Sequence, residues 1–315
     1  MTRVVLRDGG VSVALLARGA VMQDWRVPLR GEAVPVILGY RDAEAYRHDS
    51  TFMGAIVGRV ANRISGASYR QDGRRVALVA NDGAHQLHGG PGGLGAVDWR
   101  LQQLDASRAR LTHHSPEGAM GFPGAVDFTV EVALDGFAVT WDMRATASCA
   151  TPISLAQHNY YALSGGGLGG QRLHVAAGRV LARDESGIMT GGIRAAAGEL
   201  DFRAGRLLRG VGERVDDFLL FDPGRDPAQP VAELLSPNGL RLKMWSDQPG
   251  AQVYTGQSMP VLTGGHAGRA LGPGAGLCLE PSGYPNAVNV PAFPTVLHGP
   301  QTPYRQLLTV EIAPT

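Results

Sequence analysis

Frequent glycine and proline residues are the strongest constraint on what this chain can fold into. The 315 residues include 44 glycines and 20 prolines, which divide the sequence into short segments. Long helices are interrupted by such residues, whereas short strands joined by turns accommodate them. We therefore predict an all-β fold in which residues 1–315 form a single domain; together with the ordered motifs described below, the short segments predict a large antiparallel β-sandwich.

The overall charge argues against several classes of partner. A net charge of +1 with 18% charged residues favours neither nucleic acid nor an acidic membrane surface. No apolar run approaches the roughly 18 residues of a membrane span. The apolar segment Val11–Ala17 is short and bounded by Asp8 and Arg18, unlike a signal peptide. We expect a cytoplasmic protein with no nucleic-acid or membrane partner.

The two cysteines, Cys149 and Cys278, both lie in apolar segments. They indicate neither a disulfide framework nor a thiolate metal site. No serine lies in a nucleophile elbow, and no histidine or cysteine pair has convincing zinc spacing. We therefore expect no metal and no cofactor.

Alternating apolar and polar residues predict antiparallel strands along the whole chain. Two hairpins are expected, one around Asp8-Gly9-Gly10 and one over residues 69–80 around Asp72-Gly73. Further strands are predicted at Val21–Val27, Trp99–Thr112, Gly124–Leu134, Phe137–Ala147, Leu240–Trp245, Gln252–Thr255 and Tyr304–Ile312, the last of which closes the sheet.

Glu280 is the strongest single candidate for chemistry. It follows the short apolar run Leu277–Leu279 and precedes the turn formers Pro281, Ser282 and Gly283. A carboxylate at the end of a buried strand is partly desolvated but reachable, which raises its pKa and suits a base. Its position alone equally fits a salt-bridged glutamate at the edge of a sheet.

Two earlier segments carry further candidates. Asn62 and Arg63 precede a turn at Ser65-Gly66, where they are either loop anchors or binders of hydroxyl groups. His88 lies before Gly89-Gly90, 25 residues after Arg63. One hairpin lies between these two residues, so the chain can return to the same end of a sheet.

The second half of the chain supplies the other candidates. In the segment Pro152–Leu163, a strand would place His158 and Tyr160 on one face. His158 taken alone fits a structural histidine in the core. Asp216 and Asp217 point to opposite faces of a strand, so only one of them can face a pocket. Gln252 lies 28 residues before Glu280.

These segments together resemble the aldose 1-epimerases, also called galactose mutarotases. The resemblance rests on the following segments, which occur in the order of the family: Gly58–Ile64 with its Asn-Arg pair, the Leu-His-Gly-Gly of Leu87–Gly90, Gly121–Gly124, Pro152–Leu163, Val215–Phe218 and Gly276–Pro291. The chain departs from the family at Gly95–Trp99, and it has Tyr161 and Ala162 where the family has Phe and Asn.

The resemblance implies both a fold and a reaction. The fold is the galactose mutarotase-like supersandwich, and the reaction interconverts the α and β anomers of a free aldose such as glucose or galactose. It implies Glu280 as the base, His158 as the acid and His88 as an assisting residue. It assigns Asn62, Arg63, Asp216 and Gln252 to sugar binding, with Asp217 as the alternative to Asp216.

The expected partner is a monosaccharide, and the expected state is a monomer or weak homodimer. We expect a bell-shaped pH dependence with Glu280 on the acid limb and His158 on the alkaline limb. Three other functions remain open: a non-catalytic carbohydrate-binding module, a sugar-phosphate epimerase, and a hydrolase or lyase that uses Glu280 and Asp216 as a carboxylate pair.

Overall fold

The computed structural model describes residues 1–315, except for the side chain of Ala267. None of the described residues forms an α-helix. The helical segments are short 3-10 turns: η1 (Ala43–Arg47), η2 (Ser65–Ala67), η3 (Leu94–Ala96), η4 (Ala119–Gly121), η5 (Gly198–Leu200), η6 (Gly210–Gly212), η7 (His266–Gly268) and η8 (Ala287–Asn289). Within the described chain, no helix has the length and apolar character needed to cross a membrane.

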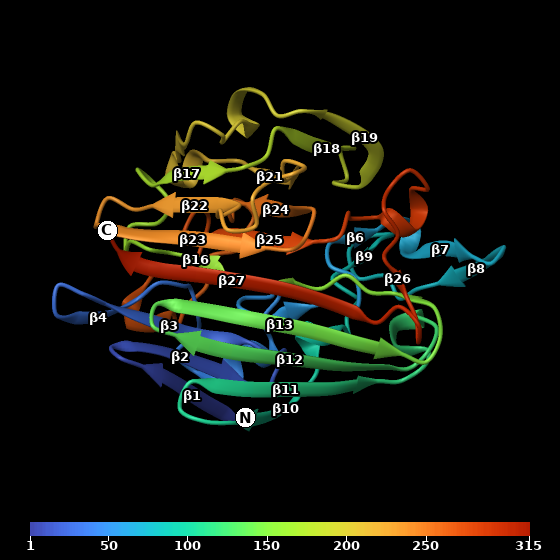
Figure 1. Ribbon diagram of the computed structural model, residues 1–315, viewed down its shortest axis with the longest axis horizontal. Helices are drawn as coiled ribbons and strands as arrows, with labels where there is room; N and C mark the ends of the chain where they lie inside the picture. The colour runs from blue at the N-terminus through green and yellow to red at the C-terminus, as the bar shows by residue number, and fades with distance from the viewer.

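The largest layer is an antiparallel sheet of nine strands (Figure 1). In spatial order these are β10 (Arg100–Gln103), β11 (Arg108–Ser115), β12 (Val126–Asp135), β13 (Ala138–Ala147), β27 (Tyr304–Pro314), β23 (Leu240–Ser246), β22 (Ala232–Leu235), β17 (Arg172–Val175) and β20 (Arg206–Leu207). Buried and less buried residues alternate along β12 and β13, so one face of this sheet is turned to the core.

A second antiparallel sheet of six strands carries the residues of most interest. In spatial order it contains β16 (Tyr160–Tyr161), β25 (Leu277–Ser282), β24 (Gly250–Tyr254), β21 (Asp216–Leu220), β18 (Arg179–Arg183) and β19 (Met189–Ala195). Every residue of β25 is buried, so this strand is covered on both faces. Leu277 and Leu279 belong to the main apolar core, whereas Cys278 and Glu280 point to the other face.

A four-stranded sheet and four small strand pairs complete the fold. The sheet consists of β1 (Arg3–Asp8), β2 (Val11–Leu16), β3 (Met22–Leu29) and β4 (Glu32–Pro35). The pairs are β5 (Ile56–Val57) with β15 (Ala156–Gln157), β6 (Arg63–Ile64) with β9 (Gln86–Leu87), β7 (Ser68–Gln71) with β8 (Arg74–Ala77), and β14 (Thr151–Pro152) with β26 (Leu297–His298).

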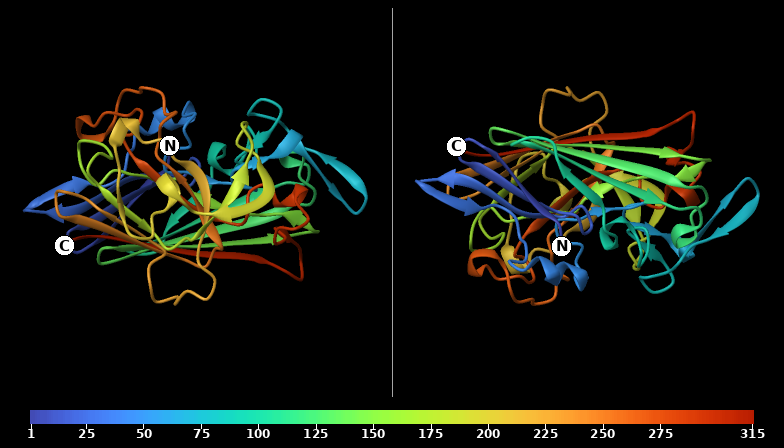
Figure 2. Two further views of the ribbon diagram at one scale, coloured as in Figure 1. Left: turned by 90° about the horizontal axis from the view of Figure 1, so that it is seen from above. Right: turned by 90° about the horizontal axis from the view of Figure 1, so that it is seen from below.

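The main core lies between these sheets. One cluster of buried apolar residues runs from Leu6 to Ile312 and draws on all three large sheets. Trp25 of β3 packs edge-on against Trp141 of β13, with 6.4 Å between ring centroids. The views in Figure 2 show the sheets stacked across this core and the β7–β8 hairpin projecting from one end. The predicted all-β antiparallel sandwich is therefore confirmed.

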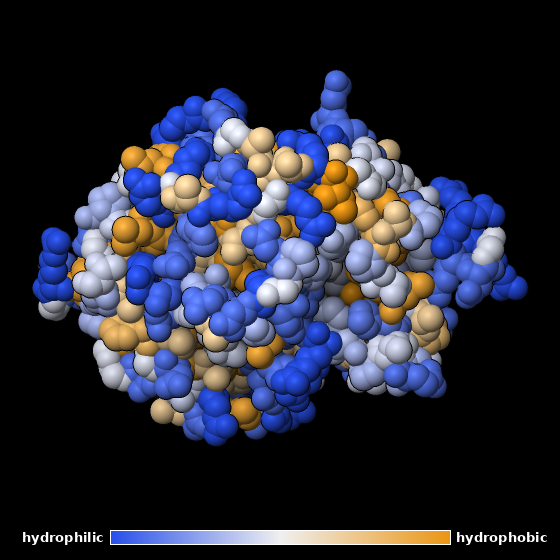
Figure 3. All heavy atoms as spheres, turned by 45° about the horizontal axis from the view of Figure 1, so that its top comes forward, coloured by the Kyte–Doolittle hydropathy of each residue, from blue (hydrophilic) through white to orange (hydrophobic). Residues whose placement is uncertain are grey.

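Charged and polar side chains cover most of the outer face drawn in Figure 3. Apolar residues gather there only in small groups, as is normal for a protein surface in water. The polar end of the projecting hairpin includes exposed Arg70, Arg74 and Arg75.

Several strand predictions hold, and three need correction. Both hairpins form, with turns at Gly9-Gly10 and Asp72-Gly73. The segment 99–112 is two paired strands, because the chain reverses between Gln103 and Arg108. The final strand β27 does not close the sheet at an edge, since it lies in the middle between β13 and β23.

The segment Pro152–Leu163 is the third correction, because it is not one continuous strand. It is broken into β14, β15 and β16, each with a different partner: β26, β5 and β25, respectively. The segment therefore passes through the interior and changes partner at each step. This path places His158 between β15 and β16, next to β25.

Candidate active site

One pocket collects all seven residues that the sequence analysis selected. A cavity of about 210 Å³ is lined by Ser50, Thr51, Phe52, Asn62, Arg63, Leu87, His88, His158, Tyr160, Asp216, Gln252, Tyr254, Ser258, Met259, Pro260 and Glu280. These residues come from segments spread over most of the chain, so the pocket exists only in the folded protein. The predicted convergence of the seven residues is therefore confirmed.

Neighbouring strands of the six-stranded sheet form one side of the pocket. Gln252 on β24 lies opposite Glu280 on β25, and Asp216 begins β21 opposite Tyr254. Paired residues on adjacent antiparallel strands point to the same face. The strand register therefore brings the amide and the two carboxylates to one surface.

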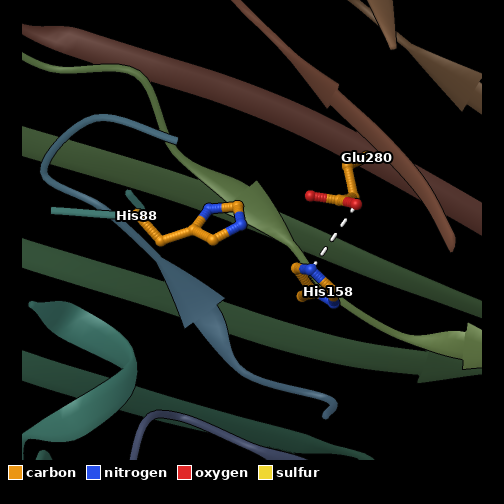
Figure 4. A group of neighbouring side chains, drawn as sticks. All are labelled: His88, His158 and Glu280. Atoms are coloured by element: carbon orange, nitrogen blue, oxygen red, sulfur yellow. Dashed lines mark ion pairs between the residues drawn. The ribbon is translucent and has the colours of Figure 1, made fainter. Parts of the chain in front are cut away.

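His158 and Glu280 face each other, with His88 nearby (Figure 4). The Nε2 atom of His158 lies 3.6 Å from Oε1 of Glu280, and both residues are at most 4% exposed. The backbone of His158 is fixed, because its N–H donates to the Ala55 carbonyl and its carbonyl accepts the Gly54 N–H. The two side chains therefore face each other from rigid positions.

His88 is held by reciprocal hydrogen bonds with Asn62. The His88 N–H donates to the Asn62 carbonyl at 3.0 Å, and the Asn62 N–H donates to Nδ1 of His88 at 3.1 Å. Because Nδ1 accepts this proton, the neutral ring must carry its own proton on Nε2. His88 thus offers a fixed hydrogen-bond donor, and its ring packs edge-on against His158 and Phe52.

Burial shifts the titration of all three groups. It raises the pKa of Glu280 well above its ordinary value, and nearby Asp216 adds to this rise. Burial lowers the pKa of His158 to about 4. It also lowers the pKa of His88 well below the ordinary value, with smaller contributions from the neighbouring His158 and Arg63. Burial therefore favours the neutral form of His88.

These pKa directions favour the opposite assignment of the two pH limbs from the one expected from the sequence. Burial penalises the charged form of both side chains, which favours a single shared proton on Glu280 over one on His158. The two groups are close enough to titrate as a unit. The acid limb then belongs to protonation of His158, and the alkaline limb to loss of the proton on Glu280.

A chain of hydrogen bonds links the other predicted residues. Asn62 Nδ2 donates to Oε1 of Gln252 at 3.0 Å, and Gln252 Nε2 donates to Oδ1 of Asp216 at 2.7 Å. Burial raises the pKa of Asp216, whereas the hydrogen bond from Gln252 lowers it. These hydrogen bonds orient the two amide groups and the carboxyl group toward the pocket.

Asp216 rather than Asp217 faces the pocket. Asp216 is among the lining residues, whereas Asp217 points to the opposite face of β21. There it is paired with Arg183 at 3.2 Å and Arg194 at 3.8 Å. The preference for Asp216 is confirmed, and Asp217 is a structural ion-pair residue.

Arg63 is oriented by a partner that the sequence analysis missed. Its Nε atom donates to Oδ2 of Asp82 at 2.6 Å, and Asp82 lies just before β9. This bond directs the guanidinium group while leaving its terminal nitrogens available to a ligand. The only sign of this contact in the sequence is that Arg63 and Asp82 are 19 residues apart across a hairpin, and such a spacing does not specify a contact.

The loop from Asp49 to Met53 supplies three further lining residues that the sequence analysis missed, Ser50, Thr51 and Phe52. The Asp49 carboxylate accepts hydrogen bonds from Tyr40 Oη, from the N–H and hydroxyl of Thr51, and from the Met53 N–H. The loop thereby holds the Phe52 ring against His88, with 4.7 Å between ring centroids. A polar loop in the sequence gives no sign of this role.

Asn286 and Asn289 of the C-terminal motif brace the site and lie outside its lining. Asn286 Oδ1 accepts the Ser65 N–H, and its Nδ2 donates to the Met189 carbonyl. Asn289 Nδ2 donates to the Ser68 carbonyl. They fasten the loop after Glu280 to the segment that follows Arg63.

The cluster His88–His158–Glu280 also has the donor types of a zinc site. One ligand atom from each lies within 4.8 Å of the others. However, the Asn62 N–H occupies Nδ1 of His88, which leaves the ring proton on Nε2. A protonated nitrogen has no lone pair for a metal, so the tautomer of His88 that this hydrogen bond imposes suits hydrogen bonding and not metal ligation.

The fold and this pocket define an all-β protein with an acid–base site surrounded by polar side chains. A family model for aldose 1-epimerase matches residues 2–310. The galactose mutarotase of Rattus norvegicus is 32% identical over 309 residues, covering 95% of this chain and 90% of the relative. The aldose 1-epimerase of Escherichia coli strain K12 is 31% identical, covering 91% and 87%. The chain belongs to the aldose 1-epimerase family.

Solved structures show the same fold. A GalM/aldose epimerase homologue from C. elegans has a TM-score of 0.92 at 24% identity, with all of both chains covered. The galactose 1-epimerase from Lactobacillus acidophilus has a TM-score of 0.83 at 24% identity, covering 98% of this chain and 92% of that one. At this identity the likeness concerns the fold.

Proposed function

We propose that this protein is an aldose 1-epimerase, an isomerase that interconverts the α and β anomers of a free aldose such as glucose or galactose. Family membership supports the reaction class. The observation that carries the assignment of residues is the buried pair Glu280 and His158, which face each other 3.6 Å apart in a pocket of monosaccharide size.

Ring opening requires a base and an acid on the same sugar. Glu280 takes the proton of the C1 hydroxyl, the C1–O electron pair forms the aldehyde, and the bond from C1 to the ring oxygen breaks. His158 donates a proton to that oxygen. Each such group is typically worth about 10²–10⁴ in rate. The aldehyde rotates about C1–C2, and the ring closes with the two roles reversed.

The shared proton fits this cycle. The resting pair holds one proton on Glu280, and its transfer to His158 produces the base and the acid together. No net proton enters or leaves during a turnover, as isomerisation requires. His88 donates from Nε2 to the ring or C1 oxygen, where it stabilises the negative charge that develops as the bonds rearrange.

The remaining residues hold the other hydroxyl groups. Asn62, Gln252 and Asp216 form a connected row of donors and acceptors, and Arg63 adds donors directed by Asp82. Polar groups that are already oriented lose little entropy when a sugar binds. We therefore assign these four residues to sugar binding. The row does not by itself grade one aldose against another.

Polarimetry tests the proposal. Fresh α-D-glucose, α-D-galactose and pentoses are followed with and without the protein, and the catalysed rate of approach to the equilibrium rotation is measured. We expect acceleration with at least one of these sugars. Binding of a sugar without any acceleration would contradict the proposal and support a non-catalytic carbohydrate-binding module.

We further propose a cytoplasmic enzyme that acts as a monomer or weak homodimer, with residues 1–315 as one domain and a monosaccharide as its partner. Cys149 and Cys278 are free thiols, which suits a reducing compartment. The apolar cluster from Leu6 to Ile312 supports one folding unit. The pocket is lined by residues of one chain, so a second subunit is not needed for it. Light scattering on the purified protein tests the oligomeric state.

A further inference from the structure

Cys278 approaches Nδ1 of His158, whereas Glu280 approaches Nε2, the other ring nitrogen. We propose that Cys278 and Tyr160 are positioning residues, which hold the ring proton of His158 on Nδ1 and thereby keep Nε2 as the nitrogen that exchanges a proton with Glu280 and the sugar. The kinetic part of this inference rests on the proposed function. The assignment of the His158 ring proton to Nδ1 is independent of that function.

The strand register brings the three residues together. Cys278 and Glu280 are two positions apart on β25, so both side chains point to the same face. Tyr160 on β16 lies opposite Cys278. The Cys278 Sγ atom is 3.7 Å from Nδ1 of His158, within the range of a hydrogen bond to sulfur, and Cys278 is fully buried. The rings of His158 and Tyr160 have centroids 5.2 Å apart.

The Thr51 carbonyl determines which atom donates in the contact between Cys278 and His158. The Tyr160 hydroxyl donates to the Thr51 carbonyl at 3.1 Å, and a carbonyl can only accept. The phenol oxygen of Tyr160, which lies opposite Cys278 on the paired strand, keeps a lone pair that can accept the thiol proton of Cys278. The thiol keeps that proton, since burial raises its pKa. The sulfur is left as the acceptor for Nδ1–H of His158.

Thr51 is itself held in place, so the last acceptor in this series of hydrogen bonds is fixed. Its N–H and hydroxyl both donate to the Asp49 carboxylate, at 3.2 and 2.7 Å. The sequence of donors therefore runs from His158 through Cys278 and Tyr160 to the Thr51 carbonyl. Every polar hydrogen in it has an acceptor, as buried polar groups require.

The consequence is that the two histidines of the pocket are held in opposite tautomers. The Asn62 N–H makes His88 keep its proton on Nε2, whereas the Cys278 sulfur makes His158 keep its proton on Nδ1. An imidazole that shuttles protons through one nitrogen needs the other nitrogen held protonated. His158 meets this requirement and His88 does not, which separates the acid from the assisting donor.

The tautomer is read by long-range ¹H–¹⁵N correlation spectra of protein labelled with ¹⁵N-histidine, at neutral pH and without sugar. We expect neutral His158 in the wild type to be protonated on Nδ1. In Cys278→Ala and in Tyr160→Phe the population should shift toward Nε2–H. Cys278→Ser keeps a donor and an acceptor at this position and should preserve the wild-type tautomer. Cys149→Ala, at an exposed thiol, is the matched control.

Mutarotation rates provide the second readout. Losing one neutral hydrogen bond predicts a fall in kcat of about three- to tenfold for Cys278→Ala and Tyr160→Phe, with KM within about twofold. Cys278→Ser should restore kcat. Tyr160→Phe removes only a hydroxyl, so it keeps the test valid should Cys278→Ala fold poorly.

Two results would overturn the inference: a wild-type His158 protonated on Nε2, or an unchanged tautomer in both Cys278→Ala and Tyr160→Phe. In the second case the carbonyl of His158 itself would be the acceptor for Nδ1–H. If the tautomer behaves as expected but the wild type does not accelerate mutarotation, the proposed function fails while the assignment of the proton stands.

Discussion

The two sides of the pocket differ in how firmly their polar groups are already bonded. On the binding side, Asn62, Gln252 and Asp216 are joined by hydrogen bonds of 2.7–3.0 Å. On the catalytic side, Glu280 approaches His158 only to 3.6 Å, which is longer than a hydrogen bond. In the proposed mechanism, the groups that change partner during the reaction are thus loosely paired, and the groups that only hold the sugar are oriented before it arrives.

Glu280→Gln is the strongest test of this difference. The amide keeps the shape of the side chain but cannot take the C1 proton. We expect the catalysed rate to fall by about 10²–10⁴, while sugar affinity changes little. Polarimetry gives the rate, and calorimetry gives the affinity. Glu233→Gln, the same change on a strand of the other large sheet, is the matched control and should retain activity.

His158→Asn should lose a comparable amount, because ring opening also needs a proton on the ring oxygen. The double variant should be only slightly worse than either single one, since the two residues act as one proton-transfer unit. Strictly multiplicative losses would show that the two groups act independently. A near-wild-type rate for Glu280→Gln would place the base elsewhere.

Arg63→Ala tests the binding side and should have a smaller effect. Loss of a hydrogen bond from a charged donor is worth about 1.5–3 kcal/mol, so the dissociation constant should rise about ten- to a hundredfold. The rate at saturating sugar should fall less, because this contact exists in both ground and transition states. Arg70→Ala, on the projecting hairpin, is the control. If Arg63→Ala lowered kcat alone and left the dissociation constant unchanged, the proposed difference between the binding side and the catalytic side of the pocket would be wrong.

The pH dependence of kcat/KM sharpens the comparison on the catalytic side. The singly protonated pair is the active form, so the profile should be a bell. The acid limb should lie near the lowered pKa of His158, at about 4, and the alkaline limb should reflect the raised pKa of Glu280. Subtracting the spontaneous reaction at each pH isolates the catalysed part. An acid limb near pH 6.5, where a solvated histidine titrates, would show that burial does not control the pair.

Removal of divalent metal should have the smallest effect of all. His88 presents a protonated nitrogen, so we expect dialysis against a chelator to leave the rate within about twofold of its starting value. The untreated protein is the control. A loss that added zinc restores would mean that His88 changes tautomer and that the cluster with His158 and Glu280 binds an ion.

The structure brings the seven predicted residues to one pocket, although Gln252 and Glu280 lie inside β24 and β25 and not at strand ends. The apolar run Leu277–Leu279 correctly predicts a buried strand, but Pro281 and Ser282 do not end it after Glu280, because β25 continues to Ser282 in its pairing with β24. Local alternation similarly predicts the two hairpins. The motif order then limits which of these side chains can meet.

Other features depend on contacts that no local pattern records. The break of Pro152–Leu163 into three pieces follows from its three separate partner strands. The partnership of Arg63 with Asp82 needs the pairing of β6 with β9. The reversed pKa order of Glu280 and His158 comes from burial by segments far away in the chain, which sequence position does not reveal.

The central position of β27 has a consequence for how the molecule assembles. This strand is the last in the chain, yet it pairs with β13 on one side and β23 on the other. Until residues 304–314 are in place, the nine-stranded sheet exists as two unjoined parts, each with an unpaired edge. Such non-local pairing slows folding and leaves edges open to association with other chains. The two parts of the nine-stranded sheet are therefore joined only once the last of its strands in the sequence has paired.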